Sequence, residues 1–156
     1  MTKYKIGLTG LIGSGKSLAA GYFASLGIEI VDTDLISHNI TKPGAVAMPS
    51  IINTFGLEYL STDGVLDRGK LRELVFNDVE QKQKLEAILH PLIFDEVKKQ
   101  VETSKSKYII IVVPLLFQSP RYTRYLDRSI FVDCDEAVLV SRVIKRNGLN
   151  RDMVLS

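Results

Sequence analysis

The sequence contains little cysteine, little net charge and no long hydrophobic run. Cys134 is the only cysteine in 156 residues, which excludes an intrachain disulfide and fits a reducing compartment. The formal net charge is +2, so bulk charge gives no support for a nucleic-acid or membrane partner. The longest apolar stretch, YIIIVVPLLF, is too short to span a bilayer and contains Pro114. No signal-peptide pattern precedes the first predicted strand. We therefore expect a soluble, cytoplasmic protein.

The hydrophobic fraction of 46% is enough for one core domain, and the elements within it alternate. Apolar runs typical of strands are followed by segments with helical spacing, which predicts an α/β fold with a parallel sheet. The unbroken run YIIIVVP is typical of a strand buried on both faces. The expected strands are 4–10, 28–34, 108–114 and 128–134, and the flanking helices are 16–27 and 135–147.

The long segment between the second and third predicted strands has a different pattern. It holds three helical stretches, 45–56, 67–76 and 78–104, and is too long for a simple crossover. We expect a single domain with a core over 1–34 and 107–146 and an inserted helical lobe over about 35–106. The aromatic residues expected in the hydrophobic core are Tyr22, Phe23, Phe55, Phe76 and Phe94.

Residues 10–17 read G-x-x-x-x-G-K-S, the spacing of a phosphate-binding loop, between a strand and a helix. The glycines let backbone N–H groups approach phosphate oxygens, and the helix N-terminus adds partial positive charge. Lys16 is expected to reach the β- and γ-phosphates, and the Ser17 hydroxyl to bind Mg²⁺. The pattern predicts a nucleoside triphosphate without distinguishing a switch, a motor or a kinase. The expected nucleotide-binding residues are Gly10, Leu11, Ile12, Gly13, Ser14, Gly15, Lys16, Ser17 and Leu18.

Asp32 and Asp34 end the second predicted strand. Residues two apart on an extended chain point the same way, and the carboxyl ends of parallel strands surround the ligand. Both carboxylates are therefore expected to face the phosphate loop. One can accept a proton from an attacking hydroxyl while the other holds hydrated Mg²⁺. In the alternative interpretation, Asp34 caps the helix that follows.

Basic residues in two segments are candidates for binding anions. Arg142 and Arg146 lie four apart on the last predicted helix and share a face suited to clamping phosphate, unless that face is merely solvated. Arg68, Lys70 and Arg72 crowd the start of a lobe helix. They either bind the anionic part of an acceptor or are ordinary surface charges.

His90 precedes Pro91, and the pair has two interpretations. Pro91 is expected in the first turn of a following helix, which places His90 at a helix boundary in a structural role. Alternatively, His90 contacts the acceptor, because histidine is a common binding and catalytic residue near neutral pH.

Comparison of function classes favours a kinase. A GTPase switch needs N-K-x-D and D-x-x-G motifs; TKPG lacks the aspartate of the first, and the second does not occur in the chain. A non-catalytic nucleotide-binding module would not need an inserted lobe or the aspartate pair. The residues themselves leave the acceptor open among a nucleoside, a nucleoside monophosphate and another small hydroxyl compound.

Six segments, taken together and in order, resemble the dephospho-coenzyme A kinase family. The phosphate loop alone is shared by many families, whereas the D-x-D strand, the His-Pro helix and VPLLF together are more selective. These segments run through nearly the whole chain and read GLTGLIGSGKS, GIEIVDTD, LDRGKLRELVF, LEAILHPLI, VVPLLF and VDCDEAVLVSRVIKR.

The resemblance implies ATP-dependent phosphorylation of the ribose 3′-hydroxyl of dephospho-coenzyme A, giving coenzyme A and ADP with Mg²⁺ required. It also implies a three-layer α/β/α fold like that of nucleoside monophosphate kinases, with a helical substrate lobe and a mobile lid. The resemblance assigns ATP to Gly13–Ser17, the role of base to Asp34, support and Mg²⁺ to Asp32, and the lid to Arg142. The expected substrate-binding residues are Thr9, Asp32, Asp34, Arg68, Arg72 and His90.

The chain departs from the family pattern in three places. Leu11 occupies a position where the family usually has glycine, and Gln118 one where it often has glutamate. The family also continues beyond Ser156, so we expect a truncated chain with a partial lid over about 142–156 and with strand 128–134 left as a sheet edge. The expected assembly is a monomer or a weak homo-oligomer.

Overall fold

A computed structural model describes residues 3–11, 14–114 and 116–133. The chain divides into two compact units: Met1–Thr33 with Gln100–Ser156, and Asp34–Lys99. The last predicted helix, with Arg142 and Arg146, lies outside the described residues, as do Cys134 at the end of the predicted strand 128–134 and the predicted lid. Of the helices that are described, none combines the length and hydrophobicity needed to cross a membrane.

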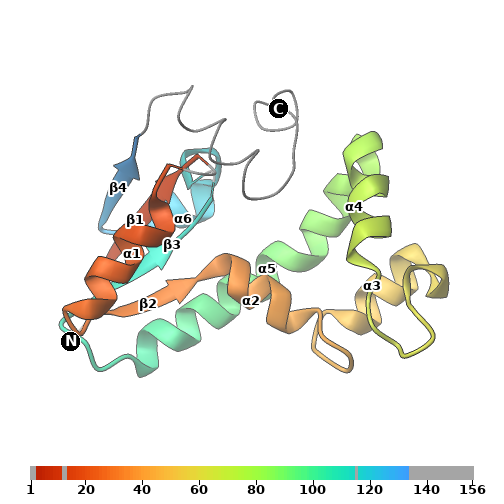
Figure 1. Ribbon diagram of the computed structural model, residues 1–156, viewed down its shortest axis with the longest axis horizontal. Coiled ribbons are helices and arrows are strands. Elements are labelled where there is room, and N and C mark those ends of the chain that lie inside the picture. The colour runs from red at the N-terminus through yellow and green to blue at the C-terminus, as the bar shows by residue number, and fades with distance from the viewer. Residues whose placement is uncertain (1–2, 12–13, 115, 134–156) are drawn as a thin grey trace. The chain divides into compact units, whose positions relative to one another are not determined.

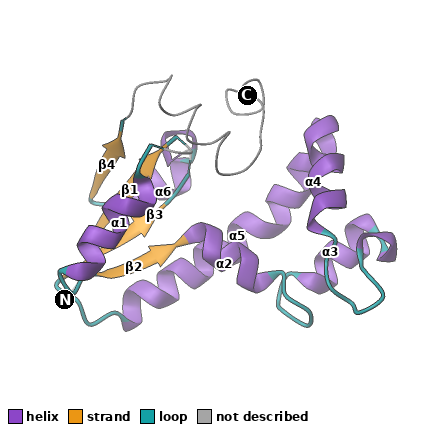
Figure 2. Ribbon diagram, viewed as in Figure 1, coloured by secondary structure: helices purple, strands orange, loops and turns teal. Residues whose placement is uncertain are grey.

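The first unit is built on a parallel four-stranded sheet in the order β2-β3-β1-β4, drawn as arrows in Figures 1 and 2. This arrangement confirms the predicted α/β fold with a parallel sheet. The register pairs Leu8 and Asp32 with Val112, and Gly10 with Val132, so the carboxyl ends of the four strands lie together along one side of the sheet. Among the described strands, β4 is an edge. The strands are β1 (Tyr4–Gly10), β2 (Glu29–Asp32), β3 (Tyr108–Val112) and β4 (Arg128–Val132).

The core of this unit lies on β1 and β3. Leu8, Ile109, Ile110 and Ile111 are fully buried, which confirms that the unbroken apolar run forms a strand covered on both faces. Burying side chains of this size stabilises the fold by about 1.5–3 kcal/mol each. The end of β1, from which the phosphate loop departs, is therefore held in a rigid sheet.

Helix α1 (Lys16–Ser25) packs on this core through three side chains. Ala19, Ala20 and Phe23 contact the core cluster that includes Leu8 and Ile110. Leu18, Tyr22 and Leu26 follow one another at intervals of four residues and are exposed by 65%, 65% and 73%. The helical spacing predicts Leu18, Ala19, Tyr22, Phe23 and Leu26 on one side of this helix; Ala19 and Phe23 do contact the core, whereas the other three are exposed. Alanines at 19 and 20 allow the helix to approach the sheet closely, and they leave Leu18, Tyr22 and Leu26 exposed.

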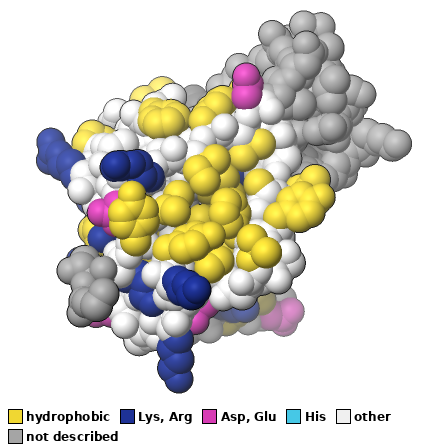
Figure 3. All heavy atoms as spheres, turned by 90° about the vertical axis from the view of Figure 1, so that its left-hand side faces the viewer, with side chains coloured by type: hydrophobic (Ala, Val, Ile, Leu, Met, Phe, Trp, Pro, Cys, Tyr) yellow, Lys and Arg dark blue, Asp and Glu magenta, His cyan; other side chains and the backbone are white. Residues whose placement is uncertain are grey.

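Large hydrophobic side chains are also exposed elsewhere on the described surface, among them Leu57 and Val79. Figure 3 shows hydrophobic side chains gathered on one face of the molecule. Of the aromatic residues predicted in the core, Phe55 is buried, Phe23 and Phe94 are half-buried, and Tyr22 and Phe76 are exposed. The core prediction is therefore wrong for Tyr22 and Phe76.

The second unit is helical, and local sequence signals explain where two of its helices begin or end. The Asp67 carboxylate accepts a hydrogen bond from the N–H of Lys70 at 3.0 Å and caps α4. Gly56 ends α3 at a φ of 100°, a conformation that favours glycine. The buried side chains of Ile51 and Leu71 come from these two helices. Three elements lie wholly in this unit: α3 (Met48–Phe55), a 3₁₀ turn at Leu57–Tyr59 and α4 (Arg68–Asn77). Helix α2 (Thr33–Ile40) begins in the first unit and α5 (Val79–Thr103) ends in it.

Helix α5 is continuous over 25 residues, with Pro91 in its interior. The predicted helix boundary at His90 and Pro91 is therefore wrong. Proline cannot donate the hydrogen bond that its position would give to the carbonyl of Ala87. A helix of this length keeps its bonds on both sides of that gap, so the missing bond does not end it. His90 lies in mid-helix and is exposed.

After β3, a 3₁₀ turn (Leu116–Gln118) and the short helix α6 (Pro120–Tyr125) lead to β4. Tyr122 is buried, with 8% of its surface exposed. The Tyr125 ring lies 5.0 Å from the Nζ of Lys5, which also pairs with Asp127 at 3.5 Å. Gln118, a departure from the family pattern, lies exposed in this turn. The contacts of Tyr125 and Asp127 tie the end of this segment to the amino-terminal part of β1.

We expect stability to fall at high pH because of Tyr122. Burial raises the pKa of its hydroxyl to about 12, whereas an unfolded tyrosine titrates near a pKa of about 10. As the pH rises, Tyr122 therefore loses its proton in the unfolded chain before it does so in the folded chain. Its contribution to the free energy of unfolding is complete below pH ~10 and is lost as the pH rises toward ~12. The loss is at most about 1.4 kcal/mol per pH unit. The free energy of unfolding, measured in urea at several pH values in this range, should fall less steeply with pH for Tyr122→Phe than for the unmodified chain.

Tyr22→Phe is the matched control, because Tyr22 is 65% exposed, and this variant should keep the slope of the unmodified chain. Burial also raises the pKa of Tyr125, so Tyr122→Phe should reduce the slope without abolishing it. Equal slopes for Tyr122→Phe and the unmodified chain would contradict the prediction.

Candidate functional site

The loop between β1 and α1 has the backbone geometry of an anion-binding turn in its described part. The N–H of Ser14 donates to the carbonyl of Leu11 at 3.0 Å. Gly15 has a φ of 103°, and its carbonyl accepts the first helical bond, from Ala19 at 2.9 Å. Because that φ favours glycine, a side chain at this position would strain the turn that opens α1. Ile12 and Gly13 lie outside the described residues.

Gly10 fixes the loop against the end of β4. A Cβ atom at this position would lie 2.6 Å from the carbonyl oxygen of Val132 and 2.6 Å from the Ser14 Oγ. The first of these neighbours is backbone in a paired strand and cannot move aside cheaply. The glycine is therefore required for close packing, and Val132 is a loop-supporting residue that sequence reasoning missed.

The side chains of the loop fit an anion. The Lys16 Nζ donates to the carbonyl of Gly10 at 3.2 Å, so its positive charge lies over the loop. Ser14 is buried, and within the described part of the chain its Oγ has no hydrogen-bond partner. A buried hydroxyl without a partner is costly, and a phosphate oxygen would satisfy it. Ser17 and Leu18, in the first turn of α1, are exposed. With the N-terminus of α1, this arrangement can bind a polyphosphate.

Asp32 and Asp34 lie on different kinds of structure. Asp32 is the last residue of β2 and is half-buried, whereas Asp34 lies exposed in the first turn of α2, which begins at Thr33. The prediction of one extended strand through both residues is wrong, so the alternation rule does not relate their directions. The capping alternative is also wrong, because Asp34 is inside the helix. A carboxylate in a first helical turn interacts favourably with the helix dipole.

Thr9, predicted to bind substrate, lies one residue before Gly10 on β1. It is 2% exposed, and its Oγ1 accepts a hydrogen bond from the N–H of Leu116 at 3.4 Å. This contact ties the end of β1 to the turn after β3. The structure therefore places Thr9 beside the phosphate loop, with its hydroxyl directed at Leu116.

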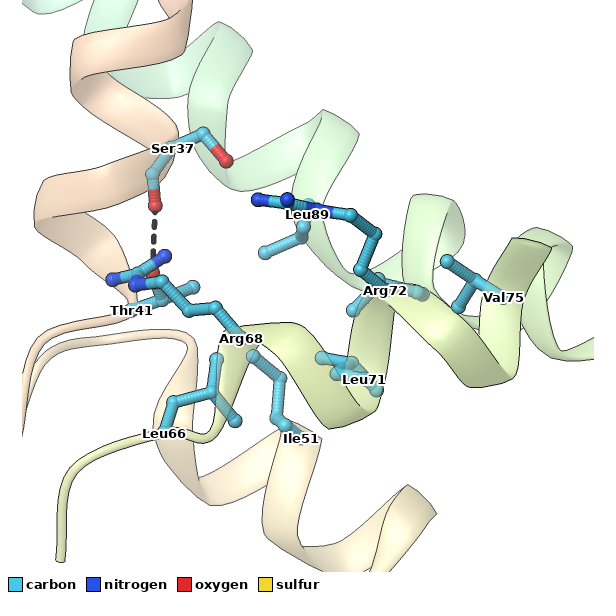
Figure 4. A pocket seen from close by; sticks show the side chains of 10 residues that line it. Ser37, Thr41, Ile51, Leu66, Arg68, Leu71, Arg72, Val75 and Leu89 are labelled. Atoms are coloured by element: carbon cyan, nitrogen blue, oxygen red, sulfur yellow. Dashed lines mark hydrogen bonds between the residues drawn. The ribbon is translucent and has the colours of Figure 1, made fainter. Parts of the chain in front are cut away.

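The second unit contains a pocket of about 220 Å³, shown in Figure 4. Its two lining arginines, Arg68 and Arg72, come from α4. The Nη2 of Arg68 donates to the carbonyl of His38 at 3.1 Å, and the side chain of Arg72 points into the pocket. The pocket therefore combines an apolar lining with guanidinium groups. The lining residues are Ser37, Thr41, Ile51, Leu66, Arg68, Leu71, Arg72, Val75, Leu85 and Leu89.

Two polar residues that were not predicted from the sequence, Ser37 and Thr41, line the pocket, whereas His90, a predicted substrate-binding residue, does not. Ser37 and Thr41 lie four apart on and after α2, and the Thr41 Oγ1 donates to the Ser37 carbonyl at 2.9 Å. Their helical spacing was a readable sign that they share a face. His90 follows Leu89 in sequence but does not line the pocket.

A family model and curated relatives agree on one family. A family model described as dephospho-CoA kinase matches residues 4–156. The dephospho-CoA kinase of Burkholderia pseudomallei is 48% identical over 151 residues, which cover 97% of this chain and 74% of that protein. A crystal structure of TT1252 from Thermus thermophilus has a TM-score of 0.86 at 30% identity and covers 99% of this chain and 78% of that one. The dephospho-CoA kinase of Campylobacter jejuni has a TM-score of 0.66 at 27% identity, with coverages of 98% and 77%.

Proposed function

This chain belongs to the dephospho-CoA kinase family, and we propose how its residues carry out the family's reaction. The reaction is the ATP-dependent phosphorylation of the ribose 3′-hydroxyl of dephospho-coenzyme A, which gives coenzyme A and ADP and completes coenzyme A biosynthesis. The observation that carries the proposal is the loop between β1 and α1. There, the Lys16 ammonium group and the buried Ser14 hydroxyl, which has no hydrogen-bond partner among the described residues, converge on a turn that favours glycine at positions 10 and 15.

In this proposal the loop binds and orients the ATP phosphates. Its N–H groups and the N-terminus of α1 contact the phosphate oxygens, and Lys16 neutralises charge on the β- and γ-phosphates. Phosphoryl transfer depends mainly on such positioning and charge stabilisation. The guanidinium group of Arg142, the expected lid arginine, would stabilise the negative charge of the phosphoryl group during transfer.

We assign Mg²⁺ to Ser17 and Asp32. In the described part of the chain, no cluster of three or more histidine, cysteine or acidic residues forms a metal site of its own. Mg²⁺ in phosphate-binding enzymes needs only one or two protein oxygens, because the substrate phosphates and water supply the others. A hydroxyl in the first turn of α1 and a carboxylate at the end of β2 fit that requirement. When bound, Mg²⁺ neutralises phosphate charge.

We assign the role of general base to Asp34. Its carboxylate would accept the proton of the 3′-hydroxyl while the hydroxyl oxygen forms its bond to the γ-phosphorus. The bond between that phosphorus and the oxygen bridging to ADP breaks, and ADP leaves with the electron pair. The exposure of Asp34 is consistent with this role, because a base must reach a substrate hydroxyl.

We assign acceptor binding to the pocket of the second unit. Dephospho-coenzyme A carries a pyrophosphate between less polar parts, and this pocket offers guanidinium groups above an apolar lining. Guanidinium groups bind phosphate oxygens in a planar, bidentate geometry. Arg68 and Arg72 are the proposed partners of the pyrophosphate. His90 does not line this pocket, so its proposed contact with the acceptor lies elsewhere.

Arg72→Ala is expected to raise the KM for dephospho-CoA by ~10-fold or more, because a charge-assisted hydrogen bond contributes about 1.5–3 kcal/mol. The KM for ATP should change little. Lys70→Ala is the matched control: Lys70 lies on the same helix, donates to the carbonyl of Glu58 at 2.8 Å and does not line the pocket. Equal effects of the two substitutions on the KM for dephospho-CoA would show that only bulk charge matters.

The function itself is tested by an acceptor screen. With ATP and Mg²⁺, kcat/KM should be highest for dephospho-CoA among a set that includes adenosine, adenosine monophosphate and shikimate. A higher value for a nucleoside or a nucleoside monophosphate would favour the alternative acceptor class. ATP binding without transfer to any acceptor would indicate a non-catalytic nucleotide-binding module. We further propose that the chain has no nucleic-acid or membrane partner, because its net charge is only +2. We also propose that it acts in the cytoplasm, since a single cysteine fits a reducing compartment, and as a monomer or weak homo-oligomer.

A further inference from the structure

Thr33 lies between the two aspartates, where the chain changes from strand to helix. Asp32 is the last residue of β2, and Thr33 is the first residue of α2. Thr33 is only 6% exposed, and its Oγ1 donates a buried hydrogen bond to the carbonyl oxygen of Val112 at 2.8 Å. The hydroxyl therefore joins the start of α2 directly to the end of β3.

The acceptor of this bond is well fixed. Val112 is the last residue of β3 and pairs with Asp32 of β2 on one side and with Leu8 of β1 on the other. The next residue, Val113, donates to the carbonyl of Leu8 at 3.0 Å. The Val112 carbonyl thus belongs to the same rigid edge from which the phosphate loop departs.

A threonine at this position restricts the junction through a hydrogen bond that an apolar residue cannot make. Its branched side chain has few χ1 rotamers, so a bonded hydroxyl also fixes the direction of the backbone that carries it. Without the bond, the end of β2 and the first turn of α2 could shift against β3. Displacement of a reacting group by about 1 Å can lower turnover by ~10²-fold.

We propose that Thr33 is a positioning residue for phosphoryl transfer: its hydrogen bond to Val112 holds the strand-to-helix junction from which the Asp32 and Asp34 carboxylates project. This inference rests on the proposed function of the two aspartates. Thr33 contacts no reacting atom in this scheme and acts only through its neighbours. Its effect should therefore fall on kcat and not on the affinity for ATP.

The test compares Thr33→Val, which keeps the shape and removes the hydroxyl, with Thr33→Ser, which keeps the hydroxyl. Ser106→Ala is the matched control, because the Ser106 Oγ donates to the carbonyl of Tyr108 at 2.6 Å, at the opposite end of the same strand. We measure kcat on dephospho-CoA, the KM for ATP and the thermal midpoint of each variant. Thr33→Val should lower kcat by ~10-fold or more, with the KM for ATP unchanged within about two-fold.

Thr33→Ser should keep kcat within about three-fold of the unmodified chain, and Ser106→Ala should lower the midpoint without lowering kcat. If Thr33→Val does not fold, Thr33→Ala takes its place in the comparison. The proposal is overturned if the variant without the hydroxyl keeps its kcat, or if Thr33→Ser loses as much as Thr33→Val. Failure of the unmodified chain to phosphorylate dephospho-CoA would instead overturn the proposed function, and this assay is run first.

Discussion

Replacement of Lys16 by alanine is expected to lower kcat on dephospho-CoA by ~10²–10³-fold and to leave the fold intact. The Lys16 ammonium group lies over the loop, 3.2 Å from the carbonyl oxygen of Gly10. Its charge is therefore in place before the reaction, and loss of one preorganised group of this kind costs about 3–4 kcal/mol in the transition state. Turnover is measured by ADP release, and folding by the thermal midpoint.

The fold should tolerate this change, because Lys16 contributes one hydrogen bond at the helix N-terminus and no core packing. Lys107→Ala is the matched control: this exposed lysine lies one residue before β3, far along the strand from the carboxyl edge that holds the loop. The control should keep both kcat and the midpoint. Turnover of Lys16→Ala within a few-fold of the unmodified chain would show that this loop does not hold the transferred phosphate.

The phosphate loop and the buried strand could be predicted from sequence because local residue types determine both. A turn at a φ of 103° favours glycine, and the close approach of Val132 excludes a side chain at Gly10. A run such as Ile109–Ile111 has no polar face to present to water, so it forms a strand covered on both sides. In each case the physical requirement leaves few alternatives.

The faces and ends of helices were less predictable because they depend on contacts between distant residues. Tyr22 has the spacing of a core residue, but the neighbouring alanines let α1 pack closely on the sheet and leave Tyr22 exposed. Pro91 is a local helix breaker, yet the rest of α5 sustains the helix through it. The start of α2 at Thr33 involves a hydrogen bond to Val112, 79 positions later in the chain. No local pattern contains that bond.

Asp34→Asn is expected to lower kcat by ~10²-fold or more, while the Kd for ATP changes little. Asparagine keeps the shape of the side chain and its place in the first turn of α2, but it cannot accept the proton of the acceptor hydroxyl. The substitution therefore removes the proposed base without removing a group that holds ATP. Single-turnover transfer to dephospho-CoA and equilibrium binding of ATP measure the two effects separately.

Asp32→Asn and Asp63→Asn complete this comparison. Asp32 is the proposed Mg²⁺ ligand, so its substitution should raise the Mg²⁺ concentration needed for half-maximal turnover by ~10-fold or more, since loss of a bond to a charged group costs about 1.5–3 kcal/mol. Asp63 is exposed in a turn of the second unit and should change neither quantity. The opposite pattern, in which Asp34→Asn weakens binding of Mg²⁺ and ATP but leaves transfer from the bound nucleotide normal, would exchange the two roles. Asp34 would then be the metal ligand, and Asp32, half-buried at the end of β2, would be the carboxylate to assign as base.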